Sequence, residues 1–518
     1  MREFHRWGMQ EIFLCALFLS EVFITLWHYK KIPKIMKHYF TLLTALLFTL
    51  SASAQLKLPA QVSDYMVLQQ QTKANLWGWT TPGKTVTVTP SWNTQRYTAK
   101  ADKDGRWLLS IDTPEGSFQE RQVTISDGTD TRTLQHVLIG EVWMASGQSN
   151  MQMPMKGFNN CPVEGFLDEV TNAYAWKGRI RMATLTNNDA FEPLEMSEGE
   201  WKECTPATMP DFSATAYFFA QTLTKNLNVP VGILANAWGG SRVEGWLPKH
   251  ILESYGFPTD EATIKEKWPY PMHHPMVMNN GQFWPIRDYT IKGVIWYQGC
   301  TNGTFAETRP YYAERVLKMI NYWREVKHQP TLPVYMVQIA QFAEGGNPDN
   351  IEYALLREQQ FRAAQQDERV YLASLHDVYV PEEMHQVHSS KKRIVGLRLG
   401  SMALGNTYAL AGYPREVLTY SSCKVEADKM QLTFDNWAKV GGWGSLVIKG
   451  MEISGADGVW HPAQVQVDGY TPTMTVWSPE VKAPVAVRYG FRNFSECTLS
   501  GANGLGAYPF RTDHEDLK

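Results

Sequence analysis

The sequence predicts an α/β protein: a parallel sheet covered by helices, with a β domain on each side of it. In residues 138–413, continuous apolar runs at Val231–Ala235 and Gly293–Trp296 alternate with helical stretches at Tyr312–Trp323 and Asn350–Gln366. Apolar strands that alternate with helices are typical of a parallel sheet buried on both faces. In such sheets ligands bind at the carboxyl ends of the strands, so a site is expected in the loops that follow these runs.

Short strands separated by turns characterise the regions on both sides of this α/β core. Residues 55–137 and 414–518 show this pattern, which predicts a β-sandwich-like domain in each region. The strands expected are Thr85–Val88 and Val123–Ile125 in the first region and Met430–Phe434, Gly441–Trp443 and Ala486–Tyr489 in the second.

The N-terminal region, residues 1–54, is predicted to be an extension and a signal peptide. Residues 36–54 have a short basic start, an apolar run and the small residues Ala52-Ser53-Ala54, a pattern that signal peptidase cleaves. We therefore expect the true start at Met36 and a secreted or periplasmic mature chain. The earlier apolar run at residues 12–27 contains Glu21, so no stable membrane span is expected after cleavage. A real N-terminal anchor is the alternative.

Composition excludes some partners. The chain of 518 residues has a net charge of only -3, and no dense stretch of Lys or Arg forms a surface for phosphates, so nucleic-acid binding is not expected. The 19 Trp and 23 Tyr suit platforms for sugar rings as well as a dense core.

The cysteines predict neither a metal site nor a unique set of disulfides. Export would permit disulfides, and pairing Cys161 with Cys204 and Cys423 with Cys497 keeps each bridge within one predicted domain. Cys300 is then left over. No CxxC motif or Cys/His cluster is present, so no metal or other cofactor is expected.

Ser149 is the candidate nucleophile. It lies in the run Ser-Gly-Gln-Ser-Asn-Met at residues 146–151, shortly after the apolar Val137–Ile139. A serine beside a glycine that permits a tight turn can present its hydroxyl at the sheet edge, where backbone N–H groups, including its own, face an oxyanion.

A serine nucleophile needs a base, and His388 is the best candidate. It lies in a loop that leads into a helical stretch at residues 392–404, and late loops of an α/β sheet can fold over the nucleophile. A carboxylate that orients the histidine could be Asp377 or, as weaker candidates, Glu382 or Glu383.

Two further loops follow predicted strands and complete the expected site. Gly239 and Gly240 come after Val231–Ala235 and offer a backbone N–H as the second oxyanion donor. Gln298 and Asn302 come after the strand at residue 293 and offer side-chain amide donors.

These motifs together resemble the sialate O-acetylesterase family, a branch of the SGNH hydrolases. The resemblance is carried by the segments Ser63–Gln69, Gly140–Met151, Phe212–Ala214, Gly239–Trp246, Gly293–Asn302, Leu356–Glu358 and Pro509–Asp513. It implies a flavodoxin-like catalytic domain, with Ser149 as nucleophile and His388 as base. It also implies that the glycine pair and the two amide residues form the oxyanion hole. The substrate side would be shaped by Gln148, Arg242, Glu244 and Trp246.

This chain departs from the family pattern at three points. Cys300 and Thr301 stand where the family usually has Glu and Ser, and Ser389 follows His388 where the family commonly has Pro. SGNH enzymes often place an Asp three residues before the histidine, where this chain has His385. Either Asp377 therefore serves as the acid, or Ser149 and His388 act as a dyad oriented by a backbone carbonyl.

The resemblance implies hydrolysis of acetyl esters on sugars, with O-acetylated sialic acids as the first substrate class. Arg242 could pair with a substrate carboxylate or, equally, with Glu244 of the same loop. An acetylxylan esterase of the same mechanism, a catalytically impaired carbohydrate-binding homologue and a thioester or phospholipid hydrolase are the alternatives, because a fold does not set its substrate.

Overall fold

We describe a computed structural model of the chain, which places residues 55–437, 447–468 and 471–513. The predicted signal peptide and the earlier apolar run lie outside these residues, as does the strand expected at Gly441–Trp443. The export predictions therefore stay predictions. Among the described residues, no helix combines the length and the apolar character that a membrane span requires.

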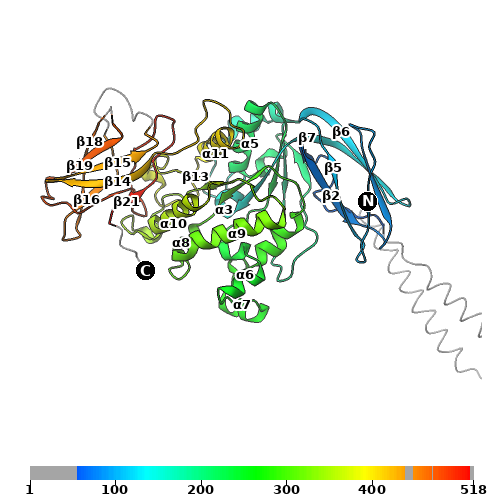
Figure 1. Ribbon diagram of the computed structural model, residues 1–518, viewed down its shortest axis with the longest axis horizontal. Coiled ribbons are helices and arrows are strands. Elements are labelled where there is room, and N and C mark those ends of the chain that lie inside the picture. The colour runs from blue at the N-terminus through cyan, green and yellow to red at the C-terminus, as the bar shows by residue number, and fades with distance from the viewer. Residues whose placement is uncertain (1–54, 438–446, 469–470, 514–518) are drawn as a thin grey trace, which may run out of the picture. The chain divides into compact units, whose positions relative to one another are not determined.

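A parallel sheet forms the centre of the fold, as predicted (Figure 1). Its strand order is β13-β12-β11-β7-β10-β8-β9, and every neighbouring pair is parallel except β8 and β9. The strands are β7 (Thr131–Gly147), β8 (Ile180–Thr184), β9 (Trp201–Glu203), β10 (Val231–Ala235), β11 (Gly293–Tyr297), β12 (Val334–Val337) and β13 (Val370–Ala373).

The register of this sheet brings three loops to one edge. Ala235 at the end of β10 pairs with Ala145 of β7, and Tyr297 at the end of β11 pairs with Gly147 of β7. The chain continues from β7 into Ser149, while later strands lie on both sides of β7. This is the switch point at which open α/β sheets bind ligands.

Helices cover both faces of the sheet (Figure 1). The helix α11 packs closely on α5, because Gly396 and Gly400 of α11 lie where a Cβ would meet Phe218 and Thr222. The α-helices are α3 (Ser149–Gln152), α4 (Phe166–Thr171), α5 (Ala214–Leu227), α6 (Lys249–Ser254), α7 (Glu261–Lys267), α8 (Cys300–Thr304), α9 (Tyr312–Val326), α10 (Glu352–Gln366) and α11 (Lys392–Asn406).

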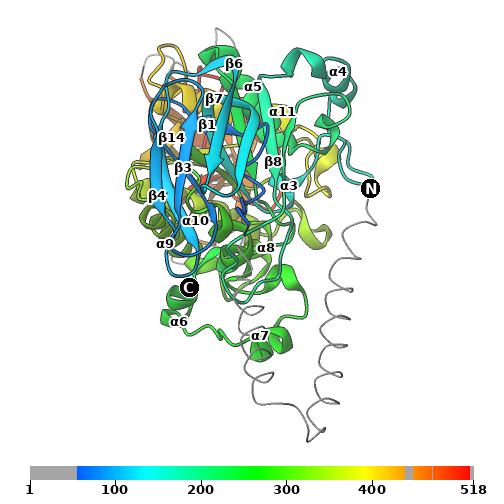
Figure 2. The same ribbon diagram turned by 90° about the vertical axis from the view of Figure 1, so that its right-hand side faces the viewer.

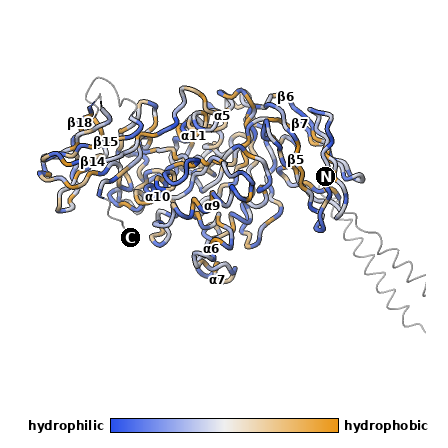
Figure 3. Tube along the Cα trace, in the orientation of Figure 1, coloured by the Kyte–Doolittle hydropathy of each residue, from blue (hydrophilic) through white to orange (hydrophobic). Residues whose placement is uncertain are grey.

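The helix α9 shows why these segments are helical. Hydrophobic and hydrophilic residues are mixed along it (Figure 3), and its apolar side chains recur at helical spacing on the buried side. Trp323 of α9 packs against Trp296 of β11 with ring centroids 5.7 Å apart. The apolar side of α9 is thus the side that it buries.

Four of the N-terminal strands, β1, β3, β4 and β6, join the central sheet through β7, whereas β2 and β5 pair with each other in a separate two-stranded sheet. In this part of the sheet (Figure 2), β1 and β6 pair with β7, β3 pairs with β6, and β4 pairs with β3. The strand β7 runs through the predicted boundary between residues 137 and 138. The strands are β1 (Val67–Gln69), β2 (Lys73–Trp79), β3 (Thr85–Pro90), β4 (Tyr97–Lys100), β5 (Arg106–Asp112) and β6 (Ser117–Ser126). Their apolar residues belong to the same core as the central sheet.

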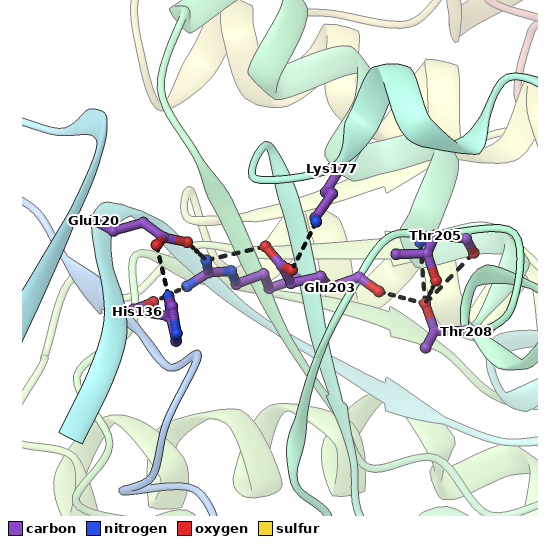
Figure 4. Close-up of polar contacts among 7 residues, drawn as sticks. Glu120, His136, Lys177, Glu203, Thr205 and Thr208 are labelled. Carbon is purple, nitrogen blue, oxygen red and sulfur yellow. Dashed lines mark hydrogen bonds and ion pairs between the residues drawn. The ribbon is translucent and has the colours of Figure 1, made fainter.

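A buried arginine links these strands to the central sheet. Arg181 of β8 has a fully buried side chain that contacts Glu120 of β6 at 3.0 Å and Glu203 of β9 at 3.3 Å. Figure 4 shows Glu120 also facing His136, whose Nδ1 lies 2.6 Å from it, and Lys177 facing Glu203. The buried charge of Arg181 is thus paired with carboxylates from both sides of the junction, which holds β6 against β8 and β9.

The C-terminal region forms two antiparallel sheets with a core of their own, which agrees with the predicted second β region. Their strand orders are β14-β15-β19-β18 and β17-β16-β20-β21. The strands are β14 (Thr419–Glu426), β15 (Lys429–Asp435), β16 (Met451–Ser454), β17 (Trp460–Pro462), β18 (Gln464–Val467), β19 (Thr473–Trp477), β20 (Ala486–Tyr489) and β21 (Phe510–Arg511).

The cysteines of the described region are all free thiols. The pairings considered from the sequence, Cys161 with Cys204 and Cys423 with Cys497, are therefore not present. Cys161 instead donates from Sγ to the backbone carbonyl of His388 at 2.7 Å.

Candidate active site

Ser149 and His388 lie within hydrogen-bond distance of each other. The distance from Ser149 Oγ to His388 Nε2 is 2.8 Å, although the two residues are 239 positions apart in the chain. Ser149 begins α3 directly after β7. The turn depends on Gly147, whose φ is +137° and whose Cβ position would lie 2.2 Å from the carbonyl oxygen of Tyr297. No other residue fits there.

His388 lies in the loop between the 3-10 turn Pro381–Glu383 and α11, and its ring is half-buried. The ring of Phe158 packs edge-on against the imidazole, with ring centroids 5.1 Å apart. The backbone N–H of His388 donates to Gln386 Oε1 at 3.1 Å. His388 is thus held by contacts from both its ring and its backbone.

Asn150 and Lys392 connect the nucleophile to the histidine loop. Lys392 is fully buried and donates from Nζ to Asn150 Oδ1. Asn150 Nδ2 in turn donates to the carbonyl oxygen of Val387 at 3.0 Å. The sequence reasoning gave neither residue a role, although each lies in a motif that it singled out.

The surroundings of His388 favour its neutral form. Burial and then the charge of Lys392 lower the pKa of His388 from 6.5 to about 4. Burial also lowers the pKa of Lys392 from 10.5 to about 8. Between these two values the imidazole is neutral and can accept a proton from Ser149, while Lys392 carries its charge.

We expect the acid limb of kcat/KM to lie near pH 4. A protonated imidazole cannot accept the hydroxyl proton, so activity falls only as His388 takes up a proton near its lowered pKa of about 4. The measurement is a pH profile of kcat/KM with a neutral ester, corrected for enzyme stability at each pH. An acid limb near pH 6.5 would contradict this environment for His388.

Asp377, the acid predicted to orient His388, is bound to another residue. Its carboxylate accepts from Nη1 and Nη2 of Arg398 at 2.7 and 2.6 Å, and it makes no hydrogen bond to His388. Asp377 follows β13, and its carboxylate pairs with Arg398 of α11. The prediction of Asp377 as the orienting acid is therefore corrected. Of the weaker candidates, Glu382 is exposed, whereas Glu383 bonds to the histidine loop.

The glycine pair lies beside the nucleophile, as expected. A Cβ placed on Gly239 would be 3.4 Å from Ser149 Cβ. The N–H of Gly239, however, donates to Gln152 Oε1 at 2.7 Å. Gly240, with a φ of +76°, has an N–H without an acceptor among the described residues. Among the described residues, the backbone N–H groups of Gly240 and Ser149 thus have no acceptor and remain the candidate donors for an oxyanion.

The two amide side chains are not free for an oxyanion. Gln298 donates from Nε2 to the carbonyl oxygen of Ser241 at 3.0 Å and to Asn302 Oδ1 at 2.8 Å. Asn302 donates from Nδ2 to Glu244 Oε2 at 3.0 Å. Both residues are fully buried, and their donors are used to hold the loop after β10. The prediction of Gln298 and Asn302 as oxyanion donors is corrected accordingly.

Three predicted substrate residues are also structural. Glu244 is fully buried and pairs with Arg315 of α9 at 2.5 Å, and Trp246 packs on Trp296 with ring centroids 5.4 Å apart. Gln148 is buried and accepts through Oε1 from the N–H of Gly299 at 2.9 Å, which joins the loops after β7 and β11. These side chains support the site from within, so their substrate-binding assignment is corrected.

Arg242 differs from these residues because its guanidinium has unused donors. It is only 1% exposed, and Nη2 donates to the carbonyl oxygen of His273 at 2.7 Å, but Nε and Nη1 have no partner. The guanidinium lies over the rings of Trp268 and Phe305 at 4.7 and 5.0 Å. Since Glu244 pairs with Arg315, the internal pair between Arg242 and Glu244 considered from the sequence does not form.

Cys300 is the first residue of α8. It is buried, and its Sγ lies 4.0 Å from Asn150 Nδ2. Burial raises the pKa of Cys300 to about 12, so it is a neutral thiol and supplies no negative charge to Lys392. In the part of the chain that the structure describes, no three His, Cys, Asp or Glu side chains are grouped as metal ligands are.

Comparisons with known proteins identify the family of this chain. Residues 139–404, just over half of the chain, match the family described as carbohydrate esterase, sialic acid-specific acetylesterase. A sialate O-acetylesterase of Homo sapiens is 29% identical over 296 residues, which cover 54% of this chain and 55% of that protein. One of Mus musculus is 27% identical over 316 residues, covering 54% and 58%. The chain thus spans about half the length of the curated relatives it matches.

A solved structure extends the likeness to more of the chain. A carbohydrate acetylesterase from Xanthomonas citri superposes with a TM-score of 0.78 at 31% identity, covering 89% of this chain and 100% of that one. The resemblance inferred from the sequence motifs is confirmed. The chain belongs to the sialic acid-specific acetylesterase family of carbohydrate esterases.

Proposed function

We propose that this protein hydrolyses acetyl esters on sugars, with Ser149 as nucleophile and His388 as base. The observation that carries the proposal is the 2.8 Å contact between Ser149 Oγ and His388 Nε2 at the carboxyl edge of the sheet. A hydroxyl in contact with a neutral imidazole is the arrangement that acyl transfer needs.

The reaction proceeds in two steps. In the first, His388 accepts the hydroxyl proton as Ser149 Oγ attacks the acetyl carbonyl, and then gives that proton to the departing sugar oxygen. In the second, His388 takes a proton from water as the water attacks the acetyl-enzyme, and then gives that proton to Ser149 Oγ as acetate leaves. The N–H groups of Ser149 and Gly240 bind the oxyanion, and one such donor contributes about 3 kcal/mol to transition-state stabilisation.

Within this function we propose O-acetylated sialic acids, which carry a carboxylate, as the preferred substrates. The support is Arg242, a buried guanidinium without a carboxylate partner in the loop that adjoins Ser149. Its free donor Nη1 can bind a carboxylate oxygen through a charge-assisted hydrogen bond, while the free Nε–H points to a different edge of the guanidinium. These atoms are shielded from solvent in the free protein, so binding has to displace the half-buried Phe305 ring that lies over them.

We expect Arg242→Gln to lose activity only on substrates with a carboxylate. On an O-acetylated sialic acid, kcat/KM should fall about 10- to 100-fold, because hydrogen bonds to a charged group contribute about 1.5–3 kcal/mol. The matched control is the methyl ester of the same sugar, which lacks the charge, with p-nitrophenyl acetate as a second neutral ester. Acetate release is the measurement.

Three results would contradict the proposal. Equal losses on the acid and on its methyl ester would give Arg242 a structural role only. Faster hydrolysis of acetylated xylo-oligosaccharides than of any sialic acid by the unmodified protein would favour an acetylxylan esterase. Absence of acetate release from every sugar ester would favour the carbohydrate-binding homologue.

A further inference from the structure

His388 lies on a loop that a carboxylate holds without touching the imidazole. Glu383 ends the 3-10 turn that precedes the loop. Its Oε2 accepts from Ser389 Oγ at 2.9 Å, and its Oε1 accepts from Ser390 Oγ at 2.5 Å. Both carboxylate oxygens are thus bound to the two residues that directly follow the histidine.

The geometry of these two serines is fixed on their other sides as well. Ser389 Oγ also accepts from the N–H of Lys391 at 3.1 Å, and the carbonyl oxygen of Ser390 accepts from the N–H of Glu164 at 2.9 Å. Ser389 is buried, with 1% of its surface exposed. The turn after His388 is therefore held between Glu383 and the residues around it.

The position of the imidazole depends on this turn. A loop is mobile unless its backbone is bound, and a displacement of about 1 Å at a reacting group can cost about 100-fold in rate. In a serine triad, an acid bound to the imidazole restrains it. Here the acid predicted for that role, Asp377, pairs with Arg398 instead. Phe158 and Gln386 contact His388 itself, and the turn that follows the histidine is restrained separately.

We propose that Glu383 is a positioning residue for the acyl transfer: through the hydroxyl groups of Ser389 and Ser390 it fixes the turn that holds His388 against Ser149. This inference rests on the proposed function. Glu383 thus restrains the position of His388, as the acid of a triad would, but it does not contact the imidazole.

The variant Glu383→Ala tests the proposal. We expect kcat for p-nitrophenyl acetate to fall about 10- to 100-fold with KM nearly unchanged, since substrate contacts are intact while the base is displaced. The rate is expressed per reactive Ser149, counted from the burst of p-nitrophenol, so loss of folded protein does not imitate the effect. Glu383→Gln, which can still accept from one serine, should retain more activity.

The matched control is Glu382→Ala, because Glu382 is exposed and belongs to the same 3-10 turn. It should leave kcat unchanged. A second test uses the serines: a Ser389→Ala and Ser390→Ala double variant should lose about as much as Glu383→Ala. Adding Glu383→Ala to it should cause little further loss, because residues that act through one another are not additive.

Two outcomes would overturn the proposal. One is a kcat for Glu383→Ala equal to that of the unmodified protein. The other is a full further loss when Glu383→Ala is added to the double serine variant, which would show that Glu383 acts by another route. Failure of the proposed function would be visible separately, as hydrolysis that persists in Ser149→Ala whatever residue stands at position 383.

Discussion

Replacement of Ser149 by alanine is expected to abolish ester hydrolysis. The change removes the atom that attacks the acetyl carbonyl, and in a serine hydrolase the loss of the nucleophile lowers kcat about 10⁶-fold. The neighbouring contacts from Asn150 to the histidine loop do not involve the hydroxyl, so the fold should persist. The measurement is the rate of p-nitrophenyl acetate hydrolysis together with the melting temperature.

The matched control for this change is Ser254→Ala. Ser254 is exposed at the end of α6, and its hydroxyl contacts only the carbonyl oxygen of Ile251. This variant should keep full activity. Residual hydrolysis in Ser149→Ala at more than a small fraction of the original rate would assign the chemistry to another group.

Replacement of His388 by alanine is expected to lower kcat about 10⁴-fold. A general base contributes about 10²- to 10⁴-fold, and the upper end is expected because Ser149 has no other base within contact. The expected loss is smaller than for Ser149→Ala, since the hydroxyl and the oxyanion donors remain. The measurement is single-turnover acylation with p-nitrophenyl acetate, with and without added imidazole as a replacement base.

His385 provides the control for this second change. It precedes His388 by three positions and is exposed, and an SGNH enzyme often has its acid at that position. Because His385 does not take part in the contact with Ser149, His385→Ala should leave acylation unchanged. If the two histidine variants lost equal activity, the dyad would be wrong.

Much of the fold could be predicted because its strands and helices carry local signals. The strands at Val231–Ala235 and Ala486–Tyr489 begin and end at the expected residues. All residues of both strands are buried, so the hydrophobic pattern in the sequence marks where each strand lies. The helix expected at Tyr312–Trp323 continues to Val326, because Arg324 in its last turn pairs with Asp367 and bonds to Leu332, far along the chain.

The candidate dyad could also be predicted, for a topological reason. Ser149 directly follows one strand of a parallel sheet, and His388 directly precedes the last helix that packs on that sheet. Because ligands of a parallel sheet bind at the carboxyl ends of its strands, the positions of the two residues in the chain are enough to predict that they meet there. The glycine pair was placed beside Ser149 by the same argument.

The roles of the surrounding polar residues could not be predicted, because their partners are distant in sequence. Gln298, Asn302 and Glu244 look available in their own loops, but Arg315 of α9 and the backbone of the loop after β10 use their hydrogen-bonding atoms. Buried polar groups almost always find such partners. Conversely, only the structure shows that Glu244 pairs with Arg315 and that Arg242 keeps two donors without a partner.

Partners that are distant in sequence also explain why the sequence does not identify the carboxylate that positions His388. From the sequence, Asp377 follows a strand end and is a reasonable orienting carboxylate, while Glu383 is one of two adjacent acids. Only the structure shows that Arg398 binds Asp377 and that Ser389 and Ser390 bind Glu383. Which carboxylate serves the histidine is thus a property of packing rather than of the motif.

The central claim, that Ser149 forms the acyl-enzyme with His388 as base, is tested most directly by mass spectrometry of the protein during turnover of a slow acetyl ester at low pH. We expect a transient gain of one acetyl group that maps to the peptide carrying Ser149, that is absent in Ser149→Ala and that forms far more slowly in His388→Ala. Acetylation of a different residue, or hydrolysis with no acetylated protein at any time, would contradict the account.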